Sequence, residues 1–213
     1  MAIKFEVISE YKDKDINLPK RSTQYSAGYD IESAVDITIP SLYKLLKQAY
    51  QEDMSIAINS KYKIDYSINE IKSIVKRLGL RVMVPTGLKV ALEPYLHLQL
   101  HMRSSIGSNC LLSLANGTGI IDADYYNNPD NEGHIHIPLI NLSPVDIHIK
   151  KGEKIAQGII MPYIVTDDDE STKARIGGFG STDIDPHFGI PVESVLNEID
   201  DFTKLVNSLQ SNK

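Results

Sequence analysis

Short segments with apolar residues at alternate positions recur along most of this chain, and they restrict its fold more than any other feature. Such segments occupy residues 3–8, 35–39, 82–90, 95–102, 134–142 and 145–149, and residues 159–161 are a further, continuously apolar strand segment. A period of two is typical of half-buried strands, and turn residues separate most of the segments. Many short strands with few helices between them predict an all-β protein, a sandwich or jelly roll.

Residues 41–80 interrupt the strand pattern with helical signals. Apolar side chains from Leu42 to Ala49 fall on one face after Ser41, and a second helix is expected between the capping pair Ser67 and Glu70 and Gly79. Residues 55–66 between them alternate weakly, as a small hairpin would. We therefore expect one domain over 1–185 with a helical insertion at about 41–80. A helical stripe in 186–213 predicts a C-terminal helical extension.

Composition excludes several classes of protein. The formal net charge is −6, which disfavours non-specific nucleic-acid binding, and the single cysteine excludes an internal disulfide. No apolar run is long enough to span a bilayer, and the first residues lack the features of a signal peptide. We expect a cytoplasmic protein that binds neither nucleic acid nor membrane.

The glycine-punctuated run from Asn116 to Tyr125 is the strongest candidate for a ligand site. Gly117 and Gly119 tolerate positive φ, which predicts a narrow β-hairpin whose backbone groups are open to a ligand. The run continues into a β-branched strand that ends at Asp122. A carboxylate held on such a strand is a candidate general base.

Other segments carry groups that suit a phosphate ester. Arg103 is followed by Ser104 and Ser105, a planar donor fork beside two hydroxyl groups. Gln157 is either a buried, satisfied amide or a donor to a ligand. The glycine before Asp30 predicts either a plain turn into a strand or a turn that aims Asp30 at a cation. A glycine-rich arm at 175–182 could fold over a phosphate ligand, but it lacks the ending of a Walker loop.

His134 and His136 share one face of a predicted strand. We expect both side chains to be exposed, because the further ligands that a zinc site needs are not evident nearby.

Five separated segments resemble, in order, the motifs of the trimeric dUTP pyrophosphatase (dUTPase) family. They are residues 27–33, 103–105, 116–125, 152–157 and 175–182, and residues 84–88 are similar to the family's strand entry. The resemblance covers most of the chain but omits 41–80 and everything after about 185. It implies a jelly-roll-like homotrimer with three sites, each built from all three subunits. Such a protein would hydrolyse dUTP to dUMP and pyrophosphate with Mg²⁺.

The resemblance also implies roles for individual residues. Asp122 would deprotonate the attacking water, and Asp30 would bind Mg²⁺ through water. The uracil and deoxyribose would be bound by Asn116, Gly119, Ile121, Tyr125 and Phe179, with Tyr125 against the sugar and Phe179 over the base. The phosphates would be held by Arg103, Ser104, Ser105, Gln157, Arg175, Ser181 and Thr182.

The chain departs from the family pattern at Arg175, which stands one residue closer to Gly177-Gly178 than is usual, and at Ser105, which leaves an alternative activity open. Ser105 stands where the family usually has glycine, and the related dCTP deaminases also have Arg-Ser-Ser at this point. That branch needs a glutamate three residues before the asparagine of the following strand, where this chain has Pro138 before Asn141. Deamination therefore ranks below pyrophosphate release. The other alternative is a nucleotide-gated regulatory protein that binds a protein partner through residues 41–80.

Overall fold

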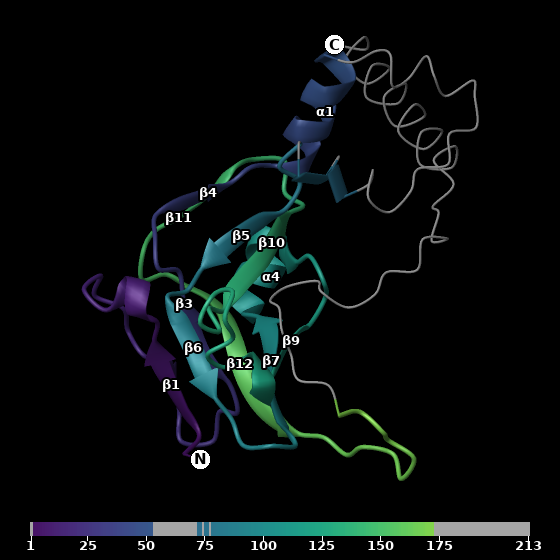
Figure 1. The fold of residues 1–213 in the computed structure, drawn as a ribbon. Helices are drawn as coiled ribbons and strands as arrows, with labels where there is room; N and C mark the ends of the chain where they lie inside the picture. Colours follow the sequence, from purple (N-terminus) through teal and green to yellow (C-terminus); the bar gives the residue numbers. More distant parts are fainter. Residues whose placement is uncertain (1, 53–71, 74, 77, 173–213) are drawn as a thin grey trace. The chain divides into compact units, whose positions relative to one another are not determined.

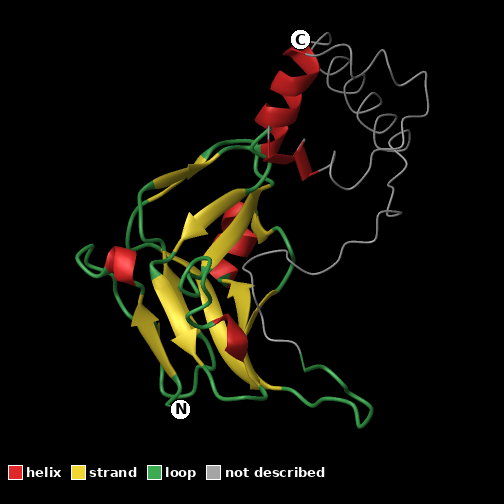
Figure 2. Cartoon of the chain, in the orientation of Figure 1, coloured by secondary structure: helices red, strands yellow, loops and turns green. Residues whose placement is uncertain are grey.

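The structure, a computed structural model, describes residues 2–52, 72–73, 75–76 and 78–172 (Figure 1). These residues form mainly β-strands (Figure 2), which confirms the all-β prediction. The strands are β1 (Lys4–Val7), β2 (Lys20–Arg21), β3 (Tyr29–Glu32), β4 (Ile37–Ile39), β5 (Val82–Pro85), β6 (Leu88–Ala91), β7 (Leu96–Met102), β8 (Leu112–Leu114), β9 (Gly119–Asp122), β10 (His136–Asn141), β11 (Ile147–Ile149) and β12 (Lys154–Pro162). The helices are η1 (Ser9–Tyr11), α1 (Leu42–Glu52), α4 (Ser104–Cys110) and η3 (Ala123–Tyr125). None of these helices is long and apolar enough to cross a membrane.

The strands pair in four sheets, and the pairing within them is antiparallel. The largest has five strands in the order β2-β3-β12-β7-β9, and a second has the order β5-β10-β8. Two further pairs are β1 with β6 and β11 with β4. The five-stranded sheet holds three of the sequence segments that we expect to bind a ligand, on β3, β12 and β9.

One hydrophobic core lies between the sheets, because alternate side chains of each strand point to it. On β7, Leu98 and Leu100 are buried, whereas Gln99 between them is partly exposed. The same cluster takes residues from both of the larger sheets. Among its members with almost no exposure are Ile31, Val84, Leu98, Leu100, Ile137, Leu139 and Ile155. A core shared in this way positions the strand ends that carry the candidate site.

The helical insertion begins where the sequence predicts it. β4 ends at Ile39, and Ser41 is fully buried just before α1. Its backbone N–H donates to Asp146 Oδ1 at 2.8 Å, and its hydroxyl donates to the Ser143 carbonyl at 2.7 Å. Gly79 adopts a φ of 63°, as expected at a helix end.

Contacts divide the chain into two compact units. One comprises Met1–Tyr43 and Leu80–Thr182, and the other comprises Lys44–Gly79 and Asp183–Lys213. The predicted hairpin at 55–66 and the predicted C-terminal helix at 186–213 lie outside the described residues, and both stay predictions.

The glycine-rich run at 116–125 is not the two-stranded hairpin that its sequence indicates. β8 pairs with β10, whereas β9 pairs with β7, so the turn joins strands of two different sheets. Gly117 takes the expected positive φ of 70°. Gly119 is needed for space instead, because a Cβ there would lie 3.0 Å from the Leu100 side chain.

The expectation that His134 is exposed is wrong. Its side chain is buried, and its Nε2 accepts a hydrogen bond from the Gly87 N–H at 3.0 Å. The imidazole rings of His134 and His136 lie 3.9 Å apart, and the ring of Tyr11 lies beyond at 5.3 Å. The two histidines share one face, as the alternation predicts, but the ring of Tyr11 from a distant segment packs against His134 there.

Candidate active site

A carboxylate surrounded by cations lies at one end of the five-stranded sheet. Asp30, on β3, pairs through Oδ1 with Arg103 Nε at 3.0 Å and through Oδ2 with Lys154 Nζ at 2.8 Å. The Ser22 hydroxyl donates to the same Oδ2 at 2.7 Å. β3 and β12 are neighbours, and Arg103 directly follows β7, the next strand, so the sheet itself gathers the three charged groups.

This environment keeps Asp30 ionised. Burial acts to raise the pKa of the carboxyl group, because it disfavours the charged form. The hydrogen bonds from Lys154 and Ser22 and the positive charge of Arg103 outweigh that effect and lower the pKa below its usual value. Two cations against one carboxylate leave a net positive group, which suits a polyphosphate better than a bare metal ion.

Gln157 lies beside Asp30 on the adjacent strand. It faces Asp30 across the β3–β12 pair and His101 across the β12–β7 pair. Its amide Nε2 donates to the Met102 carbonyl at 3.3 Å. A Cβ at Gly28 would come within 2.5 Å of Gln157 Oε1, which explains the glycine that precedes this strand. Both interpretations left open by the sequence stay open, because the amide makes one hydrogen bond, at 3.3 Å, and lies beside the cationic group.

Ser104 and Ser105 are exposed at the first turn of α4, directly after Arg103. Their hydroxyl groups therefore stand on the solvent side of the cationic group. The structure thus brings together five of the predicted residues, which are Asp30, Arg103, Ser104, Ser105 and Gln157.

A second group of predicted residues lies on β9 and its flanking turns. Asn116 is exposed at the turn before the strand, and Asp122 is partly exposed at the strand's last residue. Ile121 is buried in the core, so its backbone rather than its side chain faces outward. Tyr125 is 5% exposed, and its hydroxyl donates to the His134 carbonyl at 3.1 Å.

The two groups do not meet within one chain. Asp122 lies opposite His97, at the start of β7, whereas Arg103 lies just beyond the other end of that strand. At about 3.3 Å per residue, the strand covers about 20 Å between these two levels. A water attacking a phosphorus atom must touch the base while the phosphate touches its cations. The described part of the chain therefore holds the candidate residues in two separate groups, which we call half-sites.

The remaining predicted residues, Arg175, Phe179, Ser181 and Thr182, lie outside the described residues. Their roles stay predictions.

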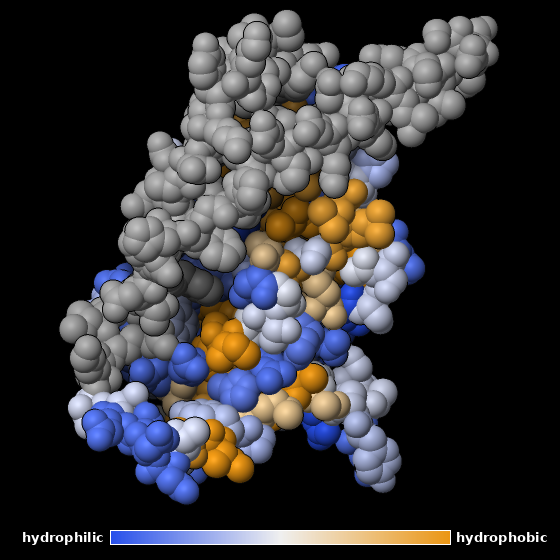
Figure 3. Space-filling model, turned by 90° about the vertical axis from the view of Figure 1, so that its right-hand side faces the viewer, coloured by the Kyte–Doolittle hydropathy of each residue, from blue (hydrophilic) through white to orange (hydrophobic). Residues whose placement is uncertain are grey.

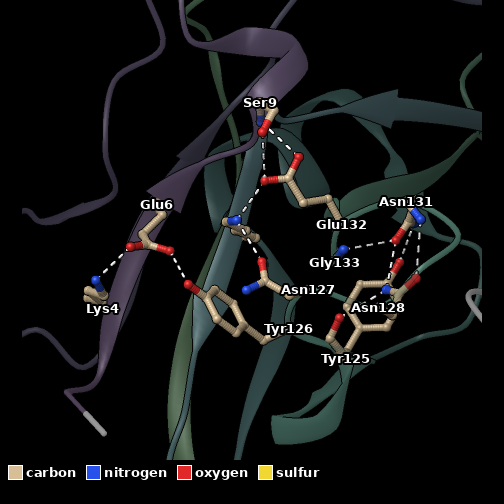
Figure 4. Close-up of polar contacts among 11 residues, drawn as sticks. Lys4, Glu6, Ser9, Tyr125, Tyr126, Asn127, Asn128, Asn131, Glu132 and Gly133 are labelled. Carbon is tan, nitrogen blue, oxygen red and sulfur yellow. Dashed lines mark hydrogen bonds and ion pairs between the residues drawn. The ribbon is translucent and has the colours of Figure 1, made fainter.

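Two features of the site were missed by reasoning from sequence. Lys154 completes the cationic group, and the signal was present, since it lies in the 152–157 motif directly before Ile155-Ala156-Gln157. The loop from Tyr125 to His134 was also missed. It is held by a network of asparagine side chains and by Lys89, which Figure 4 draws. A run of asparagines gives no periodic signal, so pattern analysis passes over it.

The sandwich and its two half-sites define a class of protein. A net positive group with exposed hydroxyls suits the phosphates of a nucleotide, and a carboxylate on a separate strand suits the activation of water. Such groups fit a nucleotide phosphohydrolase.

Comparisons with known proteins identify the family. The model of the dUTPase family matches residues 66–183. The deoxyuridine 5'-triphosphate nucleotidohydrolase of Lactococcus lactis subsp. lactis is 38% identical over 180 residues, which cover 84% of this chain and 95% of that enzyme. The chain belongs to the dUTPase family, the nucleotidohydrolases that act on dUTP.

Solved structures agree with this assignment. The crystal structure of the dUTPase from Streptococcus mutans is 32% identical in sequence, with a TM-score of 0.56, and the match covers 77% of this chain and 98% of that one. A mutant dUTPase from phage phi11 of S. aureus, whose structure shows the coordination of a structural Mg(II) ion, shares the fold at 16% identity and a TM-score of 0.51, over 81% of this chain and 98% of that one.

Proposed function

We propose that this protein hydrolyses dUTP to dUMP and pyrophosphate by attack of water on the α-phosphorus, with Asp122 as the general base. The observation that carries the proposal is the cationic group of Arg103 and Lys154 around Asp30, on a chain that belongs to the dUTPase family. It offers charge-assisted hydrogen bonds to phosphate oxygens.

When the phosphates bind, they replace Asp30 as the partner of the two cations. In the structure Asp30 holds the guanidinium of Arg103 and the ammonium of Lys154 in place. A triphosphate carries more negative charge than one carboxylate and presents several oxygens to both cations. Ser104, Ser105 and the Gln157 amide add neutral donors beside them. Further contacts would come from Arg175, Ser181 and Thr182.

Asp122 acts on the water from a different strand. It is partly exposed at the end of β9, where a carboxylate can accept a hydrogen bond from a water molecule. Taking that water's proton as it attacks makes the oxygen a better nucleophile, which commonly contributes about 10²–10⁴-fold to a rate.

The turn before β9 is the proposed uracil site. Asn116 is exposed, and the space around Gly117 is open. Backbone and amide groups there would pair with the N3–H and the carbonyls of uracil. Cytosine reverses part of this donor pattern, so a buried mismatch disfavours it. Ile121 contributes its backbone, Gly119 keeps the strand close to β7, and Tyr125 and Phe179 would enclose the sugar and the base.

Magnesium fits this chain only through water and phosphate. Among the described residues, no group of three or more His, Cys, Asp or Glu side chains is placed to hold a metal ion. Both oxygens of Asp30 already accept bonds from cations or a hydroxyl. When bound, Mg²⁺ would supply positive charge that neutralises the phosphates, and Asp30 would hold it through water ligands.

The separation of the two half-sites supports a homotrimer in which subunits complete each other's sites. The described surface also carries large exposed apolar residues, among them Tyr95, Ile120 and Tyr163. Figure 3 shows hydrophobic residues (orange) gathered in patches among hydrophilic ones. Exposed apolar patches of this kind are typical of surfaces that bind another protein chain.

A panel of nucleotides tests the proposed function. Purified protein with Mg²⁺ should release pyrophosphate from dUTP and far less from dCTP, UTP or dTTP. Asp122→Asn, which keeps the size of the side chain but removes its basicity, should reduce kcat by at least about 100-fold. A variant that keeps wild-type turnover would refute Asp122 as the base.

Two other outcomes would point elsewhere. Release of ammonia from dCTP would indicate a deaminase, although β10 carries a buried Pro138 where that chemistry needs a glutamate. A protein partner that is lost on deletion of residues 41–80, with hydrolysis retained, would support the nucleotide-gated regulatory protein, which stays a prediction.

A further inference from the structure

The loop between Tyr125 and His134, which follows the proposed base along the chain, is folded around its own asparagine side chains. Asn128 is 5% exposed, and its Nδ2 donates to the backbone oxygen of Tyr125 at 2.9 Å (Figure 4). Its Oδ1 accepts from the N–H groups of Asp130 and Asn131 at 3.1 and 3.2 Å. These bonds fix the path of the loop relative to Tyr125.

Asn131 reaches back from this loop to the Tyr125 hydroxyl. Its Nδ2 donates to that hydroxyl at 2.8 Å, while its Oδ1 accepts from Gly133 N–H at 3.0 Å and from Asn128 Nδ2 at 2.8 Å. The hydroxyl in turn donates to the His134 carbonyl at 3.1 Å. Asn131 and the backbone carbonyl of His134 therefore both bind the Tyr125 hydroxyl.

A buried lysine on β6 holds the loop by hydrogen bonds to two of its residues. Lys89 is 8% exposed, and its Nζ donates to Glu132 Oε1 and to Asn127 Oδ1, both at 2.7 Å. The same ammonium lies 5.1 Å from the centre of the Tyr126 ring. Glu132 also accepts from the Ser9 N–H at 2.9 Å and from its hydroxyl at 3.1 Å. Figure 4 shows how these contacts tie the loop to the N-terminal segment.

The loop needs such contacts because its backbone is strained. Asn127 and Glu132 have φ values of 56° and 60°, in the left-handed region that side chains other than glycine rarely adopt. These are two residues that Lys89 holds. Strain of this kind persists where the surrounding contacts over-determine it, and it is concentrated at functional sites.

We propose that Asn131 is a positioning residue for Tyr125, and that Lys89 and Glu132 form a clamp that keeps Asn131 in place. Through them the loop sets how closely the Tyr125 ring approaches the sugar, and so how strongly the enzyme rejects a 2′-hydroxyl. This inference rests on the proposed function, in which Tyr125 contacts the deoxyribose. It assigns sugar discrimination to residues that touch no substrate.

Asn131→Asp tests the inference with little change in size. The aspartate keeps the acceptor for Gly133 and Asn128 but loses the donor to the Tyr125 hydroxyl. The ratio of kcat/KM for dUTP to that for UTP should fall about ten-fold, because a loosened ring no longer excludes the extra hydroxyl. Asn109→Asp, the same chemical change at an exposed position on α4, should leave the ratio unchanged.

Tyr125→Phe distinguishes positioning from a general loss of stability. If Asn131 acts through the hydroxyl, adding Asn131→Asp to Tyr125→Phe should not lower the ratio further. Additive losses would overturn the inference, as would a variant that melts at a lower temperature but keeps the wild-type ratio. If Asn131→Asp does not fold, Lys89→Met carries the test, since it keeps the apolar stem and removes the clamp. An unchanged ratio in that variant would also overturn the inference.

The outcome for wild-type protein separates the two proposals. Without pyrophosphate release from dUTP, the proposed function fails and this inference fails with it. An active enzyme whose variants keep the dUTP to UTP ratio would overturn the inference alone.

Discussion

Burial of His134 should make the folded protein sensitive to mild acid. Burial lowers the pKa of this imidazole from 6.5 to about 4, and the charge of neighbouring His136 adds to the effect. The charges of Glu10 and Glu132 raise the pKa of His134, and that of Lys14 lowers it. Together they do not cancel the effect of burial. At neutral pH the ring is uncharged, with Nε2 free to accept from Gly87.

The sign and the magnitude follow from proton linkage. The unfolded chain takes up a proton at His134 as the pH falls below 6.5, whereas the folded chain does not until about pH 4. Stability is therefore lost as the pH falls through this window, by up to about 3 kcal/mol, at about 1.4 kcal/mol per pKa unit. Above the window His134 contributes no dependence on pH.

Urea unfolding of wild type and His134→Gln measures this contribution. The glutamine can still accept the bond from Gly87 but does not titrate. Between about pH 7 and about pH 4.5, the free energy of unfolding should fall by about 2–3 kcal/mol more for wild type than for the variant. Both are measured at the same protein concentration, because the stability of an oligomer depends on it. His148→Gln, at an exposed position on β11, should lose as much as wild type. Equal losses in wild type and His134→Gln would refute the reasoning.

Three further predictions address the loop and the site. Gly133→Ala should lower the free energy of unfolding by about 1–3 kcal/mol, which denaturant unfolding can measure, because the φ of 80° is strained for alanine and its Cβ would lie 2.7 Å from the Tyr125 carbonyl. Asp30→Asn should leave Arg103 less firmly placed and raise KM for dUTP about ten-fold, and a KM equal to that of wild type would contradict the role of Asp30. Arg103→Ala and Asp122→Asn should each be inactive alone, yet random mixed trimers should recover about a quarter of the sites, because a site takes the two residues from different subunits. No recovery in co-expressed mixtures would mean that one chain builds the site.

Much of the fold was predictable because it depends on local periodicity. The alternation around Leu98 and Leu100 identifies β7, and the helical stripe after Ser41 identifies α1. Pairing was less predictable, since two strands that flank a tight turn usually pair with each other. Here β8 and β9 belong to different sheets. β9 pairs with β7, where Gly119 packs closely against Leu100. Sequence spacing alone does not reveal which distant strand each one pairs with.

The candidate site was predictable as a set of residue types but not as a geometry. Arg103 and Asp30 each look like ligands for something outside the chain, and the structure shows that they bind each other. His134 looked exposed because alternation does not reveal that Tyr11, from a distant segment, packs against its face. Tyr125 looked like an open surface for a sugar, yet it is almost fully buried behind the asparagine loop.

The pairing of Asp30 with Arg103 and Lys154 bears on how substrate binds. A cationic pocket without a counter-charge would repel itself and leave flexible side chains to be ordered by the ligand. With Asp30 between them, both cations are already placed, and side-chain entropy has been lost before the substrate arrives. Under the proposed function, substrate binding would exchange one carboxylate for several phosphate oxygens. That exchange would free Asp30 to accept hydrogen bonds from the water ligands of a Mg²⁺ ion bound with the phosphates. Asp30 would then serve as a counter-ion before binding and as a holder of metal-bound water after it.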